Sequence, residues 1–157
     1  MQHPSTRIVT DYLMTIHAPL DPAQVVATDL HIYNVRPGGW VKGPAIQGEV
    51  IAPGADWLRV MPNGTHKLDV RMSIRADDGS IIYVSYGGRI VVPDGSAARA
   101  AAGAVLGPDD LYFVTTPIFE TASTKYGWLN DIVAVGKIAA TKEGEGGFVT
   151  YDIFAVK

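Results

Sequence analysis

The clearest pattern in the sequence is an alternation of apolar and polar residues, strictest between residues 65 and 75. The apolar positions there are Leu68, Val70, Met72 and Ile74. A period of two is typical of a β-strand with one apolar and one polar face. Asn63-Gly64 and Asp78-Gly79 flank this strand and favour tight hairpin turns, because glycine readily adopts positive φ. The stretch therefore predicts an antiparallel meander.

Similar strand-like segments recur along most of the chain, separated by turns rich in Pro and Gly. They cover residues 7–18, 25–35, 45–52, 57–61, 65–75, 80–92, 111–121, 126–140 and 148–156. The pair Gly87-Gly88 predicts either a bulge or a place where side-chain volume is absent, and Pro117 predicts a bulge or a sheet edge.

One helix is predicted. It is alanine-rich, spans residues 97–105 and has Ser96 as its N-cap. We expect a surface crossover, and a lid across one end of the fold is the alternative. About nine or ten antiparallel strands with one short helix predict an all-β fold, a single closed barrel, since closure removes exposed strand edges. With no internal repeat or linker, residues 1–157 are expected to form one domain in which residues 1–6 are loose.

Composition excludes several classes of protein. The chain has no cysteine, which rules out disulfides and thiolate chemistry and suits a reducing cytoplasm. Its net charge of −3, without a Lys/Arg block, argues against nucleic acid as a partner. No apolar run reaches the roughly 18 residues of a membrane helix, and the first residues lack a signal-peptide pattern. The expected partners are small molecules or further copies of the chain.

Several short motifs occur in an order that resembles a known family. They are Gly48-Glu49-Val50, Pro53-Gly54-Ala55-Asp56-Trp57-Leu58, Leu68-Asp69-Val70-Arg71, Asp77-Asp78-Gly79, Tyr112-Phe113, Phe119-Glu120-Thr121 and Trp128-Leu129-Asn130. Together they resemble the DUF3237 family, also called UPF0311, from about Thr10 to the C-terminus. The resemblance implies a lipocalin-like antiparallel barrel with a central cavity. It implies no defined activity.

Two carboxylates are the main candidates for acid–base chemistry. Asp56 follows a strand connection, where a side chain can point into a barrel mouth as a general base or can instead cap its own turn. Glu120 lies in an aromatic strand, so its carboxylate is either buried in the lumen with a partner or exposed at a strand end. Phe119 and Glu120 face opposite ways, which leaves the choice open.

Arg71 and Asp69 lie two residues apart on one strand and share a face. If this face lines the cavity, Arg71 could hold an anionic or enol oxygen beside a titrating carboxylate. If it faces water, the two residues form an ordinary surface charge pair. Both interpretations stay open, because the opposite face of the strand could fill a core by itself.

Aromatic and amide side chains form a second group of candidates. Tyr126, Trp128 and Asn130 share one face if residues 126–140 form a strand, and would suit an aromatic or oxygenated ligand as well as they suit a core stripe. Trp57 is a stacking wall or a core aromatic. The remaining ligand-binding candidates are Tyr86, Arg89 and Tyr112. Tyr83 and Tyr151 are interpreted as packing residues.

The sequence predicts neither a metal nor a cofactor. The four histidines, His3, His17, His31 and His66, are scattered and lack metal-ligand spacing. Nucleotide-binding fingerprints and a nucleophile elbow are absent.

Two functions are compatible with these candidate residues. The first is a cofactor-free enzyme of isomerase, cyclase or lyase type that moves protons on a small oxygenated molecule, with Asp56, Glu120 and Arg71 as catalytic residues. The second is a non-catalytic binding or carrier barrel. A filled, self-associating structural barrel is a third, weaker interpretation.

Overall fold

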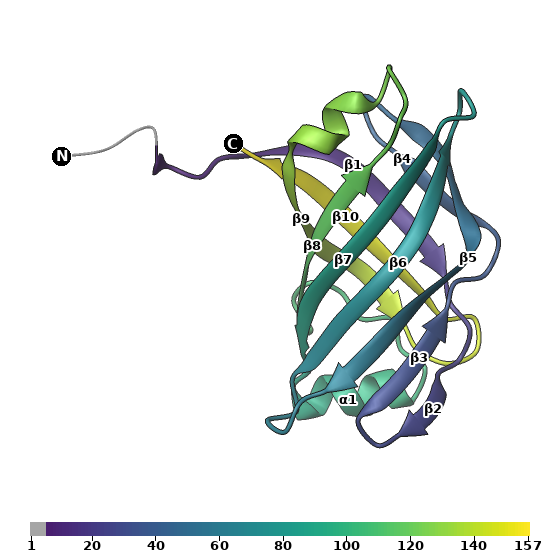
Figure 1. Ribbon diagram of the computed structural model, residues 1–157. Helices are drawn as coiled ribbons and strands as arrows, with labels where there is room; N and C mark the ends of the chain where they lie inside the picture. The colour runs from purple at the N-terminus through teal and green to yellow at the C-terminus, as the bar shows by residue number, and fades with distance from the viewer. Residues whose placement is uncertain (1–5) are drawn as a thin grey trace.

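The computed structural model describes residues 6–157, which fold into an antiparallel β-barrel with one α-helix (Figure 1). The strands are β1 (Thr10–Pro19), β2 (Gln24–Ala27), β3 (Leu30–Asn34), β4 (Gly39–Lys42), β5 (Gln47–Val60), β6 (His66–Ala76), β7 (Ile81–Val91), β8 (Tyr112–Glu120), β9 (Val133–Lys142) and β10 (Phe148–Val156). The helix α1 spans Asp94–Ala101, and a 3-10 helix, η2, spans Gly127–Asp131. The predicted loose terminus lies, for residues 1–5, outside the described part of the chain.

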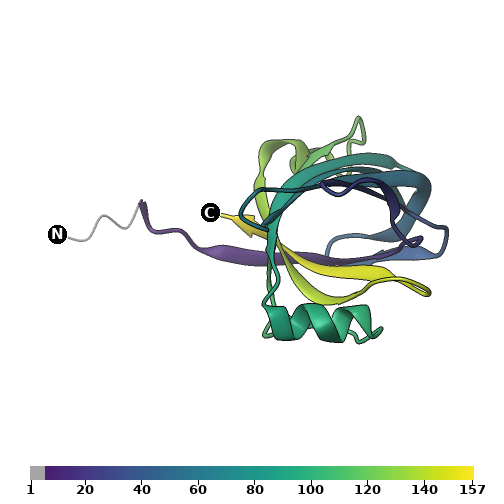
Figure 2. The ribbon, with the colours of Figure 1, turned by 90° about the horizontal axis from the view of Figure 1, so that it is seen from below.

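Eight strands close the barrel in the order β5-β4-β1-β10-β9-β8-β7-β6, and β6 pairs again with β5. Seen along its axis, the barrel is a closed ring (Figure 2). Strands β3 and β2 extend the wall beside the second half of β5, because β5 pairs with β4 up to Val50 and with β3 from Ala55 onward. The predicted closed all-β barrel is confirmed.

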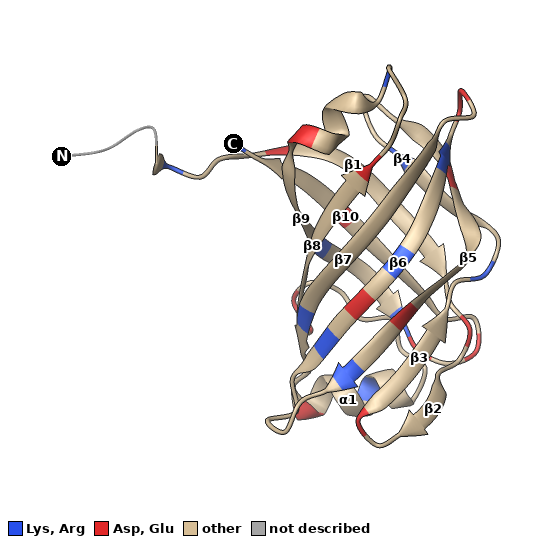
Figure 3. Cartoon of the chain, viewed as in Figure 1, with Lys and Arg blue, Asp and Glu red and all other residues tan. Residues whose placement is uncertain are grey.

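The alternation that defines β6 also defines the inside of the barrel. Leu68, Val70, Met72 and Ile74 are at most 4% exposed and belong to the hydrophobic core. The charged residues between them are exposed on the outer face, where Figure 3 shows Lys, Arg, Asp and Glu along β5, β6 and β7. Burial of the apolar row stabilises the barrel by about 25 cal/mol for each Å² removed from water.

Several predicted elements differ from the structure, and residues 25–35 form two strands, β2 and β3. Residues 45–52 and 57–61 form one strand, β5, because a register shift between Ile51 and Ala55 lets the chain continue past Pro53. Residues 126–140 begin with η2, whose Leu129 amide donates to the Tyr126 carbonyl at 3.0 Å, and the strand starts only at Val133. Leu129 is 1% exposed, so its burial in the core favours the turn over a continued strand.

The helix begins earlier than predicted, at Asp94, with Pro93 rather than Ser96 in the N-cap position. Ser96 instead lies inside the helix, where its hydroxyl donates a 2.6 Å hydrogen bond to the Asp110 carbonyl oxygen. The helix lies beside one end of the barrel (Figure 2). No helix within residues 6–157 is long and apolar enough to cross a membrane.

Candidate functional site

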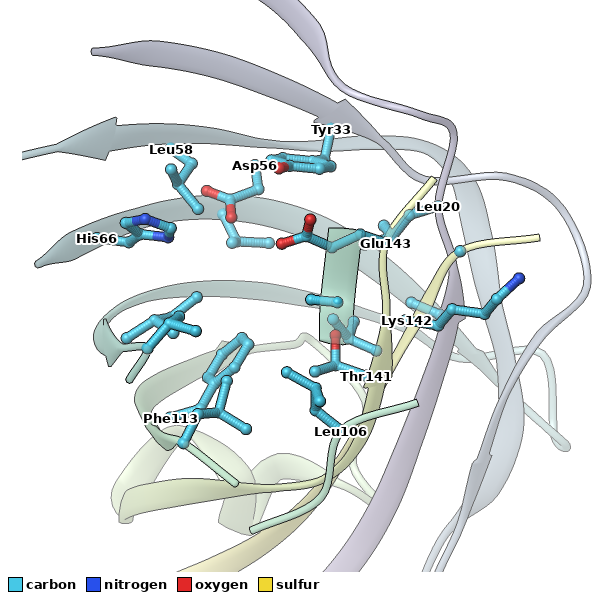
Figure 4. A pocket seen from close by; sticks show the side chains of 18 of the residues that line it. Leu20, Tyr33, Asp56, Leu58, His66, Leu106, Phe113, Thr141, Lys142 and Glu143 are labelled. Carbon is cyan, nitrogen blue, oxygen red and sulfur yellow. The ribbon is translucent and has the colours of Figure 1, made fainter. Parts of the chain in front are cut away.

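A cavity of about 260 Å³ lies inside the barrel, at the end where α1 and the β9–β10 loop are found (Figures 1 and 4). Most of its lining is apolar and comes from inward positions of the strands. These residues include Leu58, Val70, Met72, Ile90, Leu106, Leu111, Phe113 and Val149. Pockets for drug-sized ligands measure about 300–1,000 Å³, so this cavity suits a molecule of one or two rings.

Several polar side chains interrupt the apolar lining, and five of them each come from a different strand. They are Tyr33 on β3, Asp56 on β5, His66 on β6, Tyr86 on β7 and Tyr151 on β10. The period of two directs each of them inward together with its apolar neighbours. Apolar walls with a few convergent polar groups are the usual composition of a small-molecule site.

Asp56 is the only one of these five that carries a carboxyl group. Its Oδ1 accepts a hydrogen bond from the Asp69 backbone amide at 3.0 Å. Burial raises the pKa of Asp56 to about 6, opposed by the Asp69 amide and reinforced by the negative charge of Asp69. Near neutral pH the group therefore exchanges readily between acid and base, as a proton-transfer catalyst requires.

The three tyrosines remain protonated at neutral pH. Burial, followed by the negative charges of Glu143 and Asp56, raises the pKa of Tyr33 to about 12. Burial likewise raises the pKa of Tyr86 and of Tyr151. The rings of Tyr86 and Tyr151 meet edge to face, with their centroids 5.6 Å apart. The cavity thus offers phenol groups as hydrogen-bond donors and keeps them neutral.

His66 and Glu143 complete the polar mouth of the cavity (Figure 4). Burial lowers the pKa of His66, and the negative charge of Glu143 partly opposes this effect. The imidazole is therefore neutral at physiological pH. Glu143 belongs to the loop between β9 and β10, and its carboxylate points toward Asp56 and Tyr33.

Among the residues predicted from sequence, Asp56 and Tyr86 line this cavity. Glu120 lies exposed on the outer side of β8, because Phe119, which is 2% exposed, takes the inward position. Of the two placements left open for Glu120, the exposed one is correct, and its catalytic role in this cavity is ruled out by its position. Arg89 and Tyr112 are also exposed on the outside of the barrel.

Trp57, Asp69 and Arg71 lie together on the outer face of β5 and β6, where they line a shallow depression. The Arg71 guanidinium lies 6.0 Å from the centre of the Trp57 ring and 4.0 Å from the Asp69 carboxylate. They face away from the cavity because the apolar positions of β6 take the inner face. Of the two interpretations of the Asp69–Arg71 face, the solvent-facing one is correct.

Tyr126, Trp128 and Asn130 lie at the opposite end of the barrel, near the β6–β7 turn. Tyr126 is 1% exposed and donates a 2.9 Å hydrogen bond to Asp77. The Asn130 side chain bonds both the amide and the carbonyl of Thr121. Because these residues belong to η2 and its N-cap, they do not form the row on one strand face that the sequence predicted.

Sequence reasoning did not select Tyr33, His66, Tyr151 or Glu143 as site residues. The inward alternation of residues 148–156 was a signal for Tyr151, which we had interpreted as a packing residue. No local signal joins the others, because they come from separate strands and a loop. Within residues 6–157 no group of three or more His, Asp or Glu residues could hold a metal ion.

The model of a family described as "Protein of unknown function (DUF3237)" matches residues 9–156. The chain belongs to the DUF3237 family. A UPF0311 protein of Rhodopseudomonas palustris is 32% identical over 83% of this chain and 87% of its own length. Another, from Clostridium acetobutylicum, is 38% identical, and the match spans 62% of this chain and 61% of that protein.

Solved structures resemble this DUF3237 barrel over nearly its whole length. A Rhodopseudomonas palustris protein of unknown function has a TM-score of 0.85 at 30% identity, covering 96% of this chain and 99% of that one. A beta-barrel like protein of Acinetobacter baumannii has a TM-score of 0.79 at 29% identity, covering 99% and 100%. An enzyme from Penicillium herquei has a TM-score of 0.70 at 20% identity, with full coverage of 100% of both chains. The fold is therefore related to that of an enzyme structure.

Proposed function

We propose that this DUF3237 protein is a cofactor-independent enzyme that transfers protons on a small oxygenated, partly aromatic molecule bound inside the barrel. Isomerisation, cyclisation and elimination beside a carbonyl all belong to this class. Asp56 acts as the general base and then as the general acid. The Tyr86 hydroxyl, which interacts with the Tyr151 hydroxyl, donates a hydrogen bond to the substrate oxygen as negative charge develops on it.

The environment of Asp56 is the single observation that carries the proposal. A carboxyl group with a pKa of about 6, held by one backbone amide and facing an apolar cavity, costs folding free energy without an evident structural return. Strongly perturbed pKa values of this kind cluster at functional sites. The negative charge of Asp56 also raises the pKa of Tyr33, Tyr86 and Tyr151, which supports a shared role for the carboxylate and the phenols.

A carrier is the second candidate, and the apolar lining of the cavity favours it. A carrier would use the tyrosines to orient its ligand and would have no need of a titrating carboxyl group.

We further propose that the protein works in the cytoplasm, since the chain lacks cysteine. Self-association stays a prediction, and sedimentation at several protein concentrations would test it.

Proton transfer can be tested without the natural substrate. β-Tetralone carries acidic C–H bonds beside its carbonyl, so its uptake of deuterium from deuterium oxide at about neutral pH can be followed by proton NMR. We expect the wild-type protein to accelerate this exchange above the buffer rate. Asp56→Asn should remove the acceleration, a loss of about 10²–10⁴-fold for general acid–base catalysis. Tyr86→Phe should reduce it.

Glu120→Gln is the matched control, because it removes an exposed carboxylate outside the barrel. This variant should exchange protons at the wild-type rate. Undiminished exchange by Asp56→Asn would rule out Asp56 as the base. Binding of β-tetralone to the wild type without any exchange would favour the carrier.

A further inference from the structure

More of the charged side chains around the cavity are negative than positive. Those that line it are Asp21, Asp56, Lys142 and Glu143. Asp21 is paired with the Arg36 guanidinium, with 3.6 Å between its Oδ1 and the Arg36 Nε. Asp56 and Glu143 have no such ion pair among the described residues. The mouth of the cavity therefore carries two carboxylates, Asp56 and Glu143, whose negative charges are not balanced by an ion pair among the described residues.

Lys142 does not compensate these carboxylates. Its ammonium group points away from the cavity (Figure 4) and donates a 2.6 Å hydrogen bond to the backbone carbonyl oxygen of Glu145. His66 supplies no positive charge, because burial lowers the pKa of its imidazole. No Lys or Arg among the described lining residues therefore points its charge into the cavity.

The β9–β10 loop holds Glu143 over the opening. The Gly147 amide donates to the Gly144 carbonyl at 3.0 Å, and the Leu20 amide donates to the Gly147 carbonyl at 2.8 Å. These bonds close the loop on itself and fasten it to the end of β1. The Glu143 carboxylate consequently faces Asp56 and the Tyr33 ring across the mouth (Figure 4).

We infer that the cavity selects uncharged and cationic ligands over anionic ones, and that Glu143 at its mouth sets this preference. An amine is the favoured ligand, because an ammonium group at the mouth would meet the Glu143 carboxylate and the face of the Tyr33 ring. A carboxylate or phosphate would meet two like charges without a cation to balance them. This inference deepens the proposed function and rests on the cavity as its binding site.

Three probes of one shape separate charge from size. Naphthylethylamine, naphthylethanol and naphthylacetate carry a cation, a hydroxyl and an anion on the same ring system. Their dissociation constants are measured by isothermal titration calorimetry at about pH 8 and low salt, with wild type, Glu143→Gln and Glu145→Gln. Glu145 is the matched control, since it lies exposed in the same loop but does not line the cavity.

The wild type should bind the amine most tightly and the acetate most weakly. Glu143→Gln should reduce the amine-to-acetate affinity ratio by about tenfold and leave the alcohol unchanged, while Glu145→Gln retains the wild-type ratio. Salt at roughly 0.5 M should narrow the wild-type ratio through screening. Circular dichroism confirms that each variant is folded.

Acetate binding as tight as alcohol binding in the wild type would overturn the inference. So would equal effects of the two loop variants, because the preference would then come from net charge and not from the mouth. Failure of all three probes to bind would overturn it as well. Deuterium exchange into β-tetralone is independent of this ratio, so the charge preference and the proton transfer can fail separately.

Discussion

Replacing Asp56 by Asn should make the protein more stable at alkaline pH, although it removes the proposed base. Asn has nearly the same shape, and its side-chain oxygen can still accept the Asp69 amide hydrogen that Asp56 accepts at 3.0 Å. What the substitution removes is a negative charge that is poorly solvated inside the barrel. A gain in stability from loss of a functional group is the expected sign of a stability–activity trade-off.

The magnitude follows from the pKa of Asp56, which burial raises from the ordinary 3.8 to about 6. This difference corresponds to about 3 kcal/mol of folding free energy, an upper value for a side chain that is only partly buried. The folded state favours the protonated form. The contribution of Asp56 to the stability of the wild type is therefore fully present below the unfolded pKa of 3.8. It is lost as pH rises through the folded pKa of about 6.

Urea denaturation of wild type and Asp56→Asn at about pH 4 and about pH 8 measures this effect. At the lower pH the two proteins should agree within roughly 0.5 kcal/mol, because the wild-type carboxyl group is then largely neutral. At the higher pH the variant should be more stable by about 2–3 kcal/mol, or roughly 5–10 °C in melting temperature for a chain of this size.

Glu120→Gln is the control for this experiment, since it removes an exposed carboxylate on the outer face of β8 that does not contribute to the raised pKa of Asp56. Its stability difference from wild type should be small and nearly the same at both pH values. An Asp56→Asn variant that is no more stable than wild type at the higher pH would refute the buried-charge explanation. A gain in stability that is the same at both pH values would refute it equally.

Three further predictions concern other parts of the molecule. Gly88→Ala should lower stability by about 1–3 kcal/mol in thermal melts, because the added Cβ would lie 2.5 Å from a backbone carbonyl oxygen of β8. Gly87→Ala should be tolerated, since the nearest atom to its added Cβ lies 3.6 Å away. Tyr126→Phe should lower the free energy of unfolding by about 0.5–1.5 kcal/mol, because it removes the 2.9 Å hydrogen bond to Asp77. It should leave β-tetralone binding unchanged, and weaker binding would contradict the assignment of Tyr126 to the end of the barrel opposite the cavity. Deuterium exchange into β-tetralone should rise as pH passes through about 6 and then level off, since the base form of Asp56 is the active one, and a profile that falls in this range would refute that role.

Some features of this protein were determined by its sequence alone. The alternation in residues 65–75 separated an apolar from a polar face of β6, and the Asn-Gly and Asp-Gly pairs located its turns, whereas only the packed barrel decided which face turned inward. These are local effects, because a strand repeats every two residues and glycine at a tight turn accepts the positive φ seen at Gly64 and Gly79. The number of strands and the cost of exposed edges were then enough to predict a closed barrel.

Tertiary structure alone decided which polar residues meet. Sequence placed Phe119 and Glu120 on opposite faces, but only the packed barrel turned Phe119 inward and left Glu120 in solvent. It likewise buried Leu129 and thereby replaced the expected strand start with η2.

The surroundings of Asp56 have the same origin. Burial by residues of other strands raises its pKa, and an amide of β6 thirteen residues further along the chain opposes that rise. A period of two assigns a side chain to a face, yet it does not say which end of the barrel that side chain reaches or which distant strand lies opposite. Closure of the barrel supplies both, because it joins strands that are far apart in sequence.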